Sequence, residues 1–235
     1  MQQTMTRKQR ISMAAVSVLL SALLAVSGVM IFRELSIQQK EKEDFRELVE
    51  LVQITPSKPA QPDETPVPTD DEPEESLRDL SVLFAENSEC IGWLCIPDTA
   101  IDYPVMYTPN APQKYLRRNF YGEYSQSGVP FLDYRCNPDS GNLLIYGHNM
   151  KNGTMFSDLK KYLDADFLDS HQTIELQIGD NLYRYTISET KVTDTSDKWY
   201  EDIGRNLFED KSFLVLSTCY GGGNGRLLII AVKDN

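Results

Sequence analysis

Two apolar, β-branched runs joined by a glycine-rich tract constrain the fold near the C-terminus. Residues 213–219 (FLVLSTC) and 226–232 (RLLIIAV) have the composition of strands, and four of the six residues between them are glycine. Short connections rich in Gly and Asn between two such runs are typical of β-hairpins. We therefore predict a pair of antiparallel strands in which Cys219 and Arg226 face each other at the open end.

A nucleophilic cysteine needs a base and a group that stabilises developing charge. The chain has two histidines. His171 precedes a strand-like run, and we interpret it as a surface or turn residue. His148 comes directly after the short apolar run 143–146 and a glycine, at a strand exit, where functional side chains are often carried. A lone histidine there is more often structural, but together with Cys219 and Arg226 it indicates acyl transfer.

These residues resemble the sortases, and within them class B. Residues 146–150 (YGHNM) resemble the histidine motif of that class, residues 216–219 (LSTC) resemble its cysteine motif, and Arg226 stands where the family has its arginine. Three further stretches occur in the order of class B, so the resemblance covers roughly residues 76–235: 91–94 (IGWL), 101–105 (IDYPV) and 131–135 (FLDYR). Many class B members have a longer, acid-containing loop after the cysteine, which this chain lacks.

The resemblance implies a cysteine transpeptidase that cleaves a C-terminal sorting motif of secreted proteins after Thr, through a thioacyl enzyme. Its catalytic residues are then His148, Cys219 and Arg226, and the expected acceptor is the amine of a peptidoglycan precursor or of a pilin. We expect four neighbouring residues to bind substrate, although Thr218 is equally well explained by strand packing: Ser217, Thr218, Asn149 and Tyr220. We expect no cofactor, no metal and a monomer.

Two other functions use the same features. A hydrolytic cell-wall cysteine peptidase would employ the same three residues and let water, rather than an amine, resolve the acyl enzyme. A membrane-tethered binding module without activity is the alternative from a different class, and the joint presence of Cys, His and Arg argues against it.

The N-terminal region is predicted to anchor the chain in a membrane. Arg7, Lys8 and Arg10 precede an uncharged stretch, 11–32, whose 22 residues exceed the ~20 that a helix needs to cross a bilayer. Positive charge before the span places residues 1–10 in the cytoplasm and the rest outside. A cleaved signal peptide is the competing interpretation, but the apolar run continues past its small-residue site at 25–27.

Two segments separate this anchor from the predicted catalytic domain. Residues 33–54 have apolar positions at helical spacing among charges of both signs, which predicts a juxtamembrane helix. Residues 55–75 contain six of the 12 prolines and seven acidic residues. That composition is typical of an extended linker, which at ~3.1 Å per residue would reach roughly 60 Å.

Residues 76–235 are predicted to form one mostly β domain with added helices. A short helix over 76–87 opens it, helical stretches are expected over 155–163 and 198–208, and the resemblance implies a closed β-barrel. Seven short β-rich runs bounded by turn residues are predicted strands: 92–96, 129–132, 142–146, 173–178, 183–193, 213–219 and 227–232.

Cysteine spacing and net charge argue against a zinc site and against nucleic-acid binding. The four cysteines lack the paired spacing and neighbouring histidines of a zinc site, while a Cys90–Cys95 disulfide remains open. The chain carries a net charge of −12, and residues 76–235 contain 15 Lys and Arg against 22 Asp and Glu. With no basic stripe, nucleic-acid binding is not expected.

Overall fold

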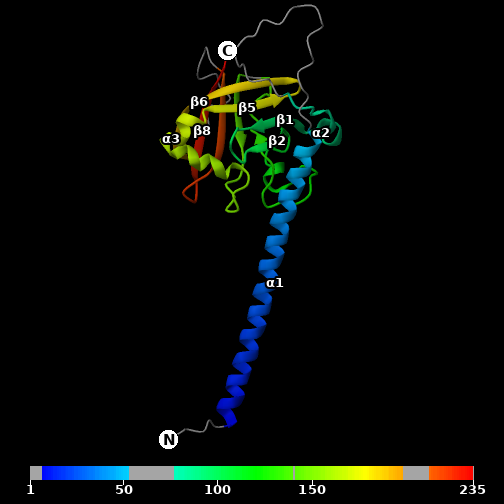
Figure 1. Ribbon diagram of the computed structural model, residues 1–235, viewed down its shortest axis with the longest axis vertical. Helices are drawn as coiled ribbons and strands as arrows, with labels where there is room; N and C mark the ends of the chain where they lie inside the picture. Colours follow the sequence, from blue (N-terminus) through cyan, green and yellow to red (C-terminus); the bar gives the residue numbers. More distant parts are fainter. Residues whose placement is uncertain (1–6, 53–76, 140, 198–211, 235) are drawn as a thin grey trace, which may run out of the picture. The chain divides into compact units, whose positions relative to one another are not determined.

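The computed structural model describes residues 7–52, 77–139, 141–197 and 212–234 (Figure 1). The chain forms two compact units, residues 1–43 and residues 44–235. The predicted linker over 55–75 and the predicted helix over 198–208 lie outside the described residues.

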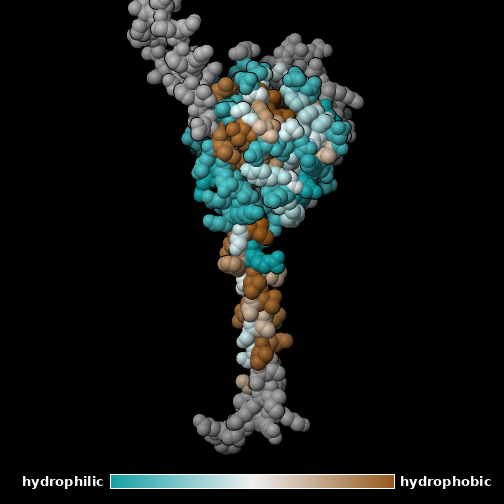
Figure 2. Space-filling model, turned by 90° about the vertical axis from the view of Figure 1, so that its right-hand side faces the viewer, coloured by the Kyte–Doolittle hydropathy of each residue, from teal (hydrophilic) through white to brown (hydrophobic). Residues whose placement is uncertain are grey.

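Helix α1 (Arg7–Leu51) is a single continuous helix of 45 residues. It contains both the predicted anchor and most of the predicted juxtamembrane helix. Apolar side chains along its first unit are exposed, among them Val18 at 70%, Leu24 at 74% and Phe32 at 72%, and Figure 2 shows them gathered along the helix. By length and composition this helix is apolar enough to cross a membrane.

Eight strands of the second unit close into a barrel in the order β1-β2-β3-β4-β7-β8-β6-β5. Most neighbours are antiparallel, but β4 and β7 run parallel, as do β2 and β3. The strands are β1 (Cys90–Cys95), β2 (Asp102–Met106), β3 (Phe131–Leu132), β4 (Asn142–Tyr146), β5 (Thr173–Ile178), β6 (Asn181–Asp194), β7 (Phe213–Cys219) and β8 (Gly225–Lys233). The predicted closed, mostly β fold is confirmed.

Short helices fill the connections between these strands. They are α2 (Ser81–Glu86), the 3-10 helices η1 (Lys114–Arg117) and η2 (Phe156–Leu163), and α3 (Ala165–Ser170). Helix α2 is shorter than the predicted segment 76–87, and η2 falls within the helix predicted over 155–163. His171 caps the C-terminal end of α3, where its ring stacks on Phe167 at 4.0 Å and Nδ1 lies 2.9 Å from the Phe167 carbonyl oxygen.

Strand β2 was not among the strands predicted from the sequence. Pro104 lies in its middle and has no N–H for a strand ladder, so such a run is not expected to be a strand. β2 pairs along its length with β1 but meets β3 only where Met106 lies opposite Phe131. The edge beside Pro104 is therefore outside the described ladder, and the proline is tolerated there.

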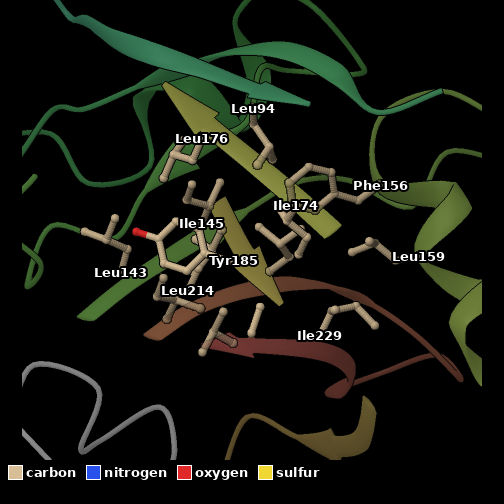
Figure 3. Close-up of a cluster of buried hydrophobic side chains, with 14 of the residues drawn as sticks. Leu94, Leu143, Ile145, Phe156, Leu159, Ile174, Leu176, Tyr185, Leu214 and Ile229 are labelled. Atoms are coloured by element: carbon tan, nitrogen blue, oxygen red, sulfur yellow. The ribbon is translucent and has the colours of Figure 1, made fainter. Parts of the chain in front are cut away.

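Two apolar clusters stabilise the second unit. The larger one fills the barrel with inward side chains from alternate strand positions, such as Leu94, Ile145, Leu176 and Leu214, which Figure 3 shows gathered between the strands. Removing this much apolar surface from water is the main favourable term in folding. The barrel thus provides a rigid frame on which the strand ends are fixed.

The smaller cluster brings the last two turns of α1 into the second unit. Leu48 is 1% exposed and Val52 is buried, and both pack in one group with Leu83 of α2, Trp93 of β1 and Tyr115 of η1. The apolar spacing that predicted a juxtamembrane helix is therefore the stripe that packs on the barrel.

Candidate active site

The predicted C-terminal hairpin is formed by β7 and β8. Cys219 is the last residue of β7, and its register partner in β8 is Arg226. The turn between them is closed by hydrogen bonds from the Tyr220 amide to the Gly225 carbonyl and from the Gly225 amide to the Gly222 carbonyl, both 3.0 Å. Gly221, Gly222 and Gly223 all have positive φ angles, which glycine adopts without steric cost. The predicted facing of Cys219 and Arg226 is confirmed, but the pair lies beside the turn of the hairpin and not at its open end.

Strand β4 runs parallel beside β7 and delivers His148 to the same end of the barrel. Tyr146 pairs with Ser217, and the Gly147 amide continues the ladder with a 3.1 Å hydrogen bond to the Ser217 carbonyl. A side chain at Gly147 would meet the ring of Phe156 at 2.5 Å, so only glycine fits there. His148 therefore leaves the sheet directly beside the residues that precede Cys219.

Two side-chain hydrogen bonds fix this strand exit. The Thr218 hydroxyl donates to the Gly147 carbonyl at 2.8 Å, and the Asn149 side-chain amide donates to the Cys219 carbonyl at 2.9 Å. The backbone on both sides of His148 is thus held against the end of β7.

The imidazole of His148 has a defined backbone partner. Its Nε2 lies 2.9 Å from the carbonyl oxygen of Leu116 in η1. A carbonyl oxygen only accepts hydrogen bonds, so the Nε2 atom carries a proton in this arrangement. In the neutral ring Nδ1 is then the nitrogen that carries no proton.

One cavity of about 500 Å³ contains all three predicted catalytic residues. Cys219 is exposed, whereas His148 and Arg226 are half-buried. One Arg226 amino group donates a 2.9 Å hydrogen bond to the Gly225 carbonyl. The other lining residues come from the η1 region, from the segment around β3 and from the ends of β4, β6 and β7: Pro112, Gln113, Tyr115, Leu116, Ser127, Val129, Phe131, Asp133, Tyr134, Arg135, Tyr146, Gly147, Thr195, Ser217 and Thr218.

The four residues predicted to bind substrate have different positions. Ser217 and Thr218 line the cavity but are only 1% and 2% exposed. Asn149 and Tyr220 do not belong to its described lining. Since the Thr218 hydroxyl and the Asn149 amide donate to backbone carbonyls, their described contacts position the strand exits.

A buried carboxylate lines the cavity and was not predicted as a site residue. Asp133 is 4% exposed and accepts hydrogen bonds from the Arg135 side chain at 2.9 Å and from the Tyr146 hydroxyl at 2.8 Å. Burial alone would raise the pKa of Asp133, but the hydrogen bonds from Arg135 and Tyr146 outweigh it and lower the pKa. The stretch 131–135 resembles class B but did not identify Asp133 as a cavity residue, because its partner Tyr146 is brought to it by the pairing of β3 with β4.

Of the remaining three thiols, Cys90 and Cys136 are buried and Cys95 is half-buried. Burial raises the pKa of Cys90 and of Cys95 to about 12 and that of Cys136 to about 11. All four cysteines are free. Cys90 and Cys95 occupy the two ends of β1, and five residues of strand span about 16 Å, far more than the ~7 Å that a disulfide bridges. Among the described residues no cluster of three His, Cys, Asp or Glu could hold a metal ion.

The chain is similar to known proteins of one family. The family model described as "Sortase domain" matches residues 94–234. Sortase B of Listeria monocytogenes is 41% identical over 128 residues, which are 54% of this chain and 50% of that protein, so the chain matches about half of that relative's length.

Solved structures extend the likeness to the fold. The structure of sortase B from B. anthracis has a TM-score of 0.63 and 25% identity, covering 85% of this chain and 98% of the other. A structure of sortase B from Listeria monocytogenes has a TM-score of 0.55 and 32% identity, covering 66% of this chain and 99% of the other.

Proposed function

Since the chain belongs to the sortase family, and within it to class B, we propose that it cleaves a C-terminal sorting motif of secreted proteins after Thr and transfers the product to a cell-wall amine. The observation that carries the proposal is the convergence of Cys219, His148 and Arg226 from three adjacent strand ends on one cavity. A thiol, an imidazole and a guanidinium in one cavity are the groups that acyl transfer through cysteine requires.

Acylation forms one bond and breaks one. The Cys219 sulfur, as thiolate, attacks the carbonyl carbon of the threonine residue, and the C–S bond forms as the carbonyl oxygen gains negative charge. Arg226 binds that oxygen and stabilises its charge. The C–N bond then breaks, and the His148 imidazolium gives its Nδ1 proton, which the Cys219 thiol released on becoming a thiolate, to the departing amine.

Transfer reverses these events with a different amine. The amino group of a peptidoglycan precursor or of a pilin attacks the thioester carbon, a new C–N bond forms, and the C–S bond breaks to restore Cys219. His148 accepts the proton that the amine loses. Because Nε2 is hydrogen-bonded to the Leu116 carbonyl, the proton exchanged with the amine passes through Nδ1 in both half-reactions.

The N-terminal helix supports action at the cell surface. Its apolar part is a candidate membrane anchor. We infer that residues 1–10 are cytoplasmic and the barrel extracellular, because Arg7, Lys8 and Arg10 precede the span. Outside the cell, the barrel would have access to both a secreted protein and a cell-wall amine.

A peptide library tests the proposed reaction. The full chain in detergent micelles is incubated with threonine-containing sorting peptides, with and without glycine or diaminopimelate-type amines, and products are identified by mass spectrometry. Ligated products that require the amine and are lost with Cys219→Ala support transpeptidation. Cleavage that is independent of the amine identifies a peptidase instead, and the absence of any product on all peptides favours a binding module.

A further inference from the structure

The Leu116 carbonyl that contacts His148 is itself held in place by other parts of the chain. Leu116 lies in the 3-10 helix η1 beside Tyr115, and both residues line the cavity. A one-turn 3-10 helix has few internal hydrogen bonds, so it needs outside contacts to keep one position. Some of those contacts come from residues just before the start of β1.

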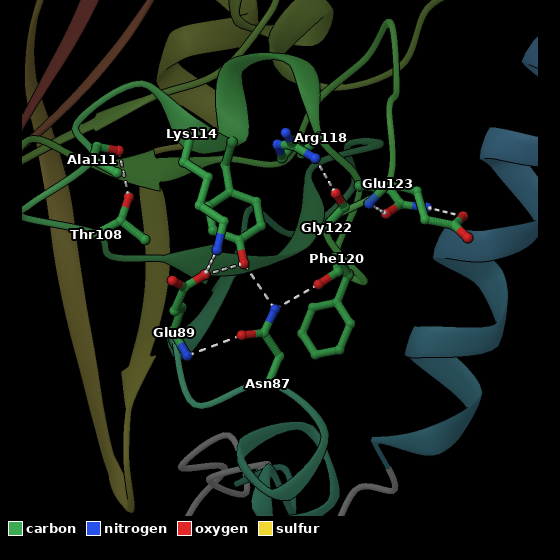
Figure 4. Close-up of polar contacts among 11 residues, drawn as sticks. Asn87, Glu89, Thr108, Ala111, Lys114, Arg118, Phe120, Gly122 and Glu123 are labelled. Atoms are coloured by element: carbon green, nitrogen blue, oxygen red, sulfur yellow. Dashed lines mark hydrogen bonds and ion pairs between the residues drawn. The ribbon is translucent and has the colours of Figure 1, made fainter.

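Tyr115 supplies the first contact. Its side chain is 1% exposed, and its hydroxyl donates to the Glu89 carboxylate at 2.6 Å while accepting from the Asn87 side-chain amide at 2.8 Å. The ammonium of Lys114 pairs with the same Glu89 oxygen. Two consecutive residues of η1 are therefore attached to one carboxylate, as Figure 4 shows for Lys114 and Glu89.

Glu89 is itself fixed by its neighbours. Its amide donates to the Asn87 side-chain carbonyl at 3.0 Å, and the Asn87 amide also donates to the Phe120 carbonyl at 2.6 Å (Figure 4). The hydrogen bond from Lys114 and then that from Tyr115 lower the pKa of Glu89, so it is an ionised acceptor at neutral pH. Hydrogen bonds to an ionised acceptor are stronger than neutral ones.

Gly128 confines the same carbonyl from another side. It has a φ of +60°, and a Cβ there would lie 2.5 Å from the Tyr115 carbonyl oxygen and 2.8 Å from that of Leu116. The Val129 amide donates to the Tyr115 carbonyl at 3.1 Å. The position of the Leu116 oxygen is thus set by Tyr115 on one side and by close backbone contact on the other.

We propose that Glu89 and Tyr115 are positioning residues for His148. The Glu89 carboxylate holds the Tyr115 hydroxyl, Tyr115 fixes η1, and the Leu116 carbonyl of η1 keeps the proton of His148 on Nε2 so that Nδ1 exchanges protons with the reacting amine. The inference rests on the proposed role of His148 in catalysis. Its structural part, the control of the tautomer, is measured without any substrate.

Nitrogen-15 NMR of the imidazole rings tests the proposal directly. The full chain, labelled with ¹⁵N in detergent micelles, contains only two histidines, and His171→Gln assigns the signals. Above the pH at which the ring loses its charge, long-range ¹H–¹⁵N correlations distinguish Nε2 from Nδ1 protonation. We expect His148 to be Nε2-protonated in the unmodified chain. In Tyr115→Phe and in Glu89→Gln, we expect the ratio of Nε2 to Nδ1 protonation to fall by about tenfold, as for loss of one hydrogen bond.

Tyr162→Phe is the matched control. Tyr162 is also buried, at 2% exposure, but its hydroxyl has no hydrogen-bond partner among the described residues. This substitution removes the same atom from the same kind of environment and should leave the His148 signals unchanged.

Three outcomes overturn the proposal. If His148 is protonated on Nδ1 in the unmodified chain, the premise that Nε2 carries the proton is wrong. If the His148 signals are unchanged in both Tyr115→Phe and Glu89→Gln, then Glu89 and Tyr115 do not position His148. A shift in Tyr162→Phe as large as that in Tyr115→Phe would mean that any loss in the core disturbs the ring. Glu89 is partly exposed, so Glu89→Gln gives an answer even if Tyr115→Phe does not fold.

Discussion

Strands β1 and β7 both carry thiols, but only β7 holds an exposed one. β1 pairs along its length with β2 and β5, and burial raises the pKa of its two cysteines, Cys90 and Cys95, to about 12. β7 places Cys219 at its last position, exposed and opposite Arg226. The thiols at the two ends of β1 are therefore buried or half-buried, whereas the thiol at the end of β7 is exposed.

The largest effect that we expect is on the rate of reaction when Cys219 of β7 is removed, compared with removal of Cys95 of β1. Cys219→Ala should lower the rate of peptide cleavage and transfer by on the order of 10⁴-fold or more, because no other nucleophile replaces the sulfur. Cys95→Ala should retain activity within about twofold. Product formation by mass spectrometry measures both, and near-normal turnover in Cys219→Ala would remove the nucleophile from the proposal.

Alkylation compares all four thiols in one experiment. At pH 8 a thiol with a pKa of about 12 is ionised to only about one part in 10⁴, and the thiolate is the species that reacts. Iodoacetamide should therefore add one label to the folded chain, at Cys219, and four in urea. Equally rapid labelling of Cys90 or Cys95 in the folded chain would mean that the distinction between β1 and β7 is absent.

Substitution of Arg226 tests the residue paired with Cys219. Arg226→Lys keeps the positive charge but loses the planar array of donors, so we expect kcat/KM to fall by about 10²-fold. Iodoacetamide labelling of Cys219 should continue, since the thiol itself is retained. An unchanged kcat/KM would leave Arg226 as a structural residue.

Substitutions in the apolar cluster that contains Trp93 of β1 are expected to change the stability of the second unit. Leu48 packs in one cluster with Trp93 of β1, so Leu48→Ala should lower the free energy of unfolding of the second unit by about 2–4 kcal/mol. Leu51, which is 42% exposed on the same helix, is the matched control, and Leu51→Ala should cost less than about 0.5 kcal/mol. Urea unfolding followed by tryptophan fluorescence compares them. Equal losses would mean that Leu48 is not part of the core.

The sequence predicted the strands that obey simple rules of composition. Residues 142–146, 173–178 and 213–219 are β-rich, bounded by turn residues, and became β4, β5 and β7. The facing of Cys219 and Arg226 could also be predicted, because the hairpin turn fixes the register of the strands it joins.

Other features depend on contacts between distant segments. β2 escaped prediction because Pro104 argues against a strand unless one knows that its far edge is largely unpaired. The partner of His148 is a backbone carbonyl at Leu116, which no side-chain motif reveals. Asp133 became part of the cavity through its contacts with Arg135 and Tyr146, and the burial of Leu48 depends on a cluster assembled from segments far apart in the chain.

The central claim is that Cys219 forms a covalent acyl intermediate. The most direct measurement is peptide mapping by tandem mass spectrometry after the full chain has been mixed with a cleavable sorting peptide and quenched in acid. We predict an added mass equal to the N-terminal product of the peptide, ending at Thr, located on Cys219 and lost when a wall-type amine is supplied. Cleaved peptide that accumulates with no adduct on Cys219, or an adduct on another thiol, would contradict the account.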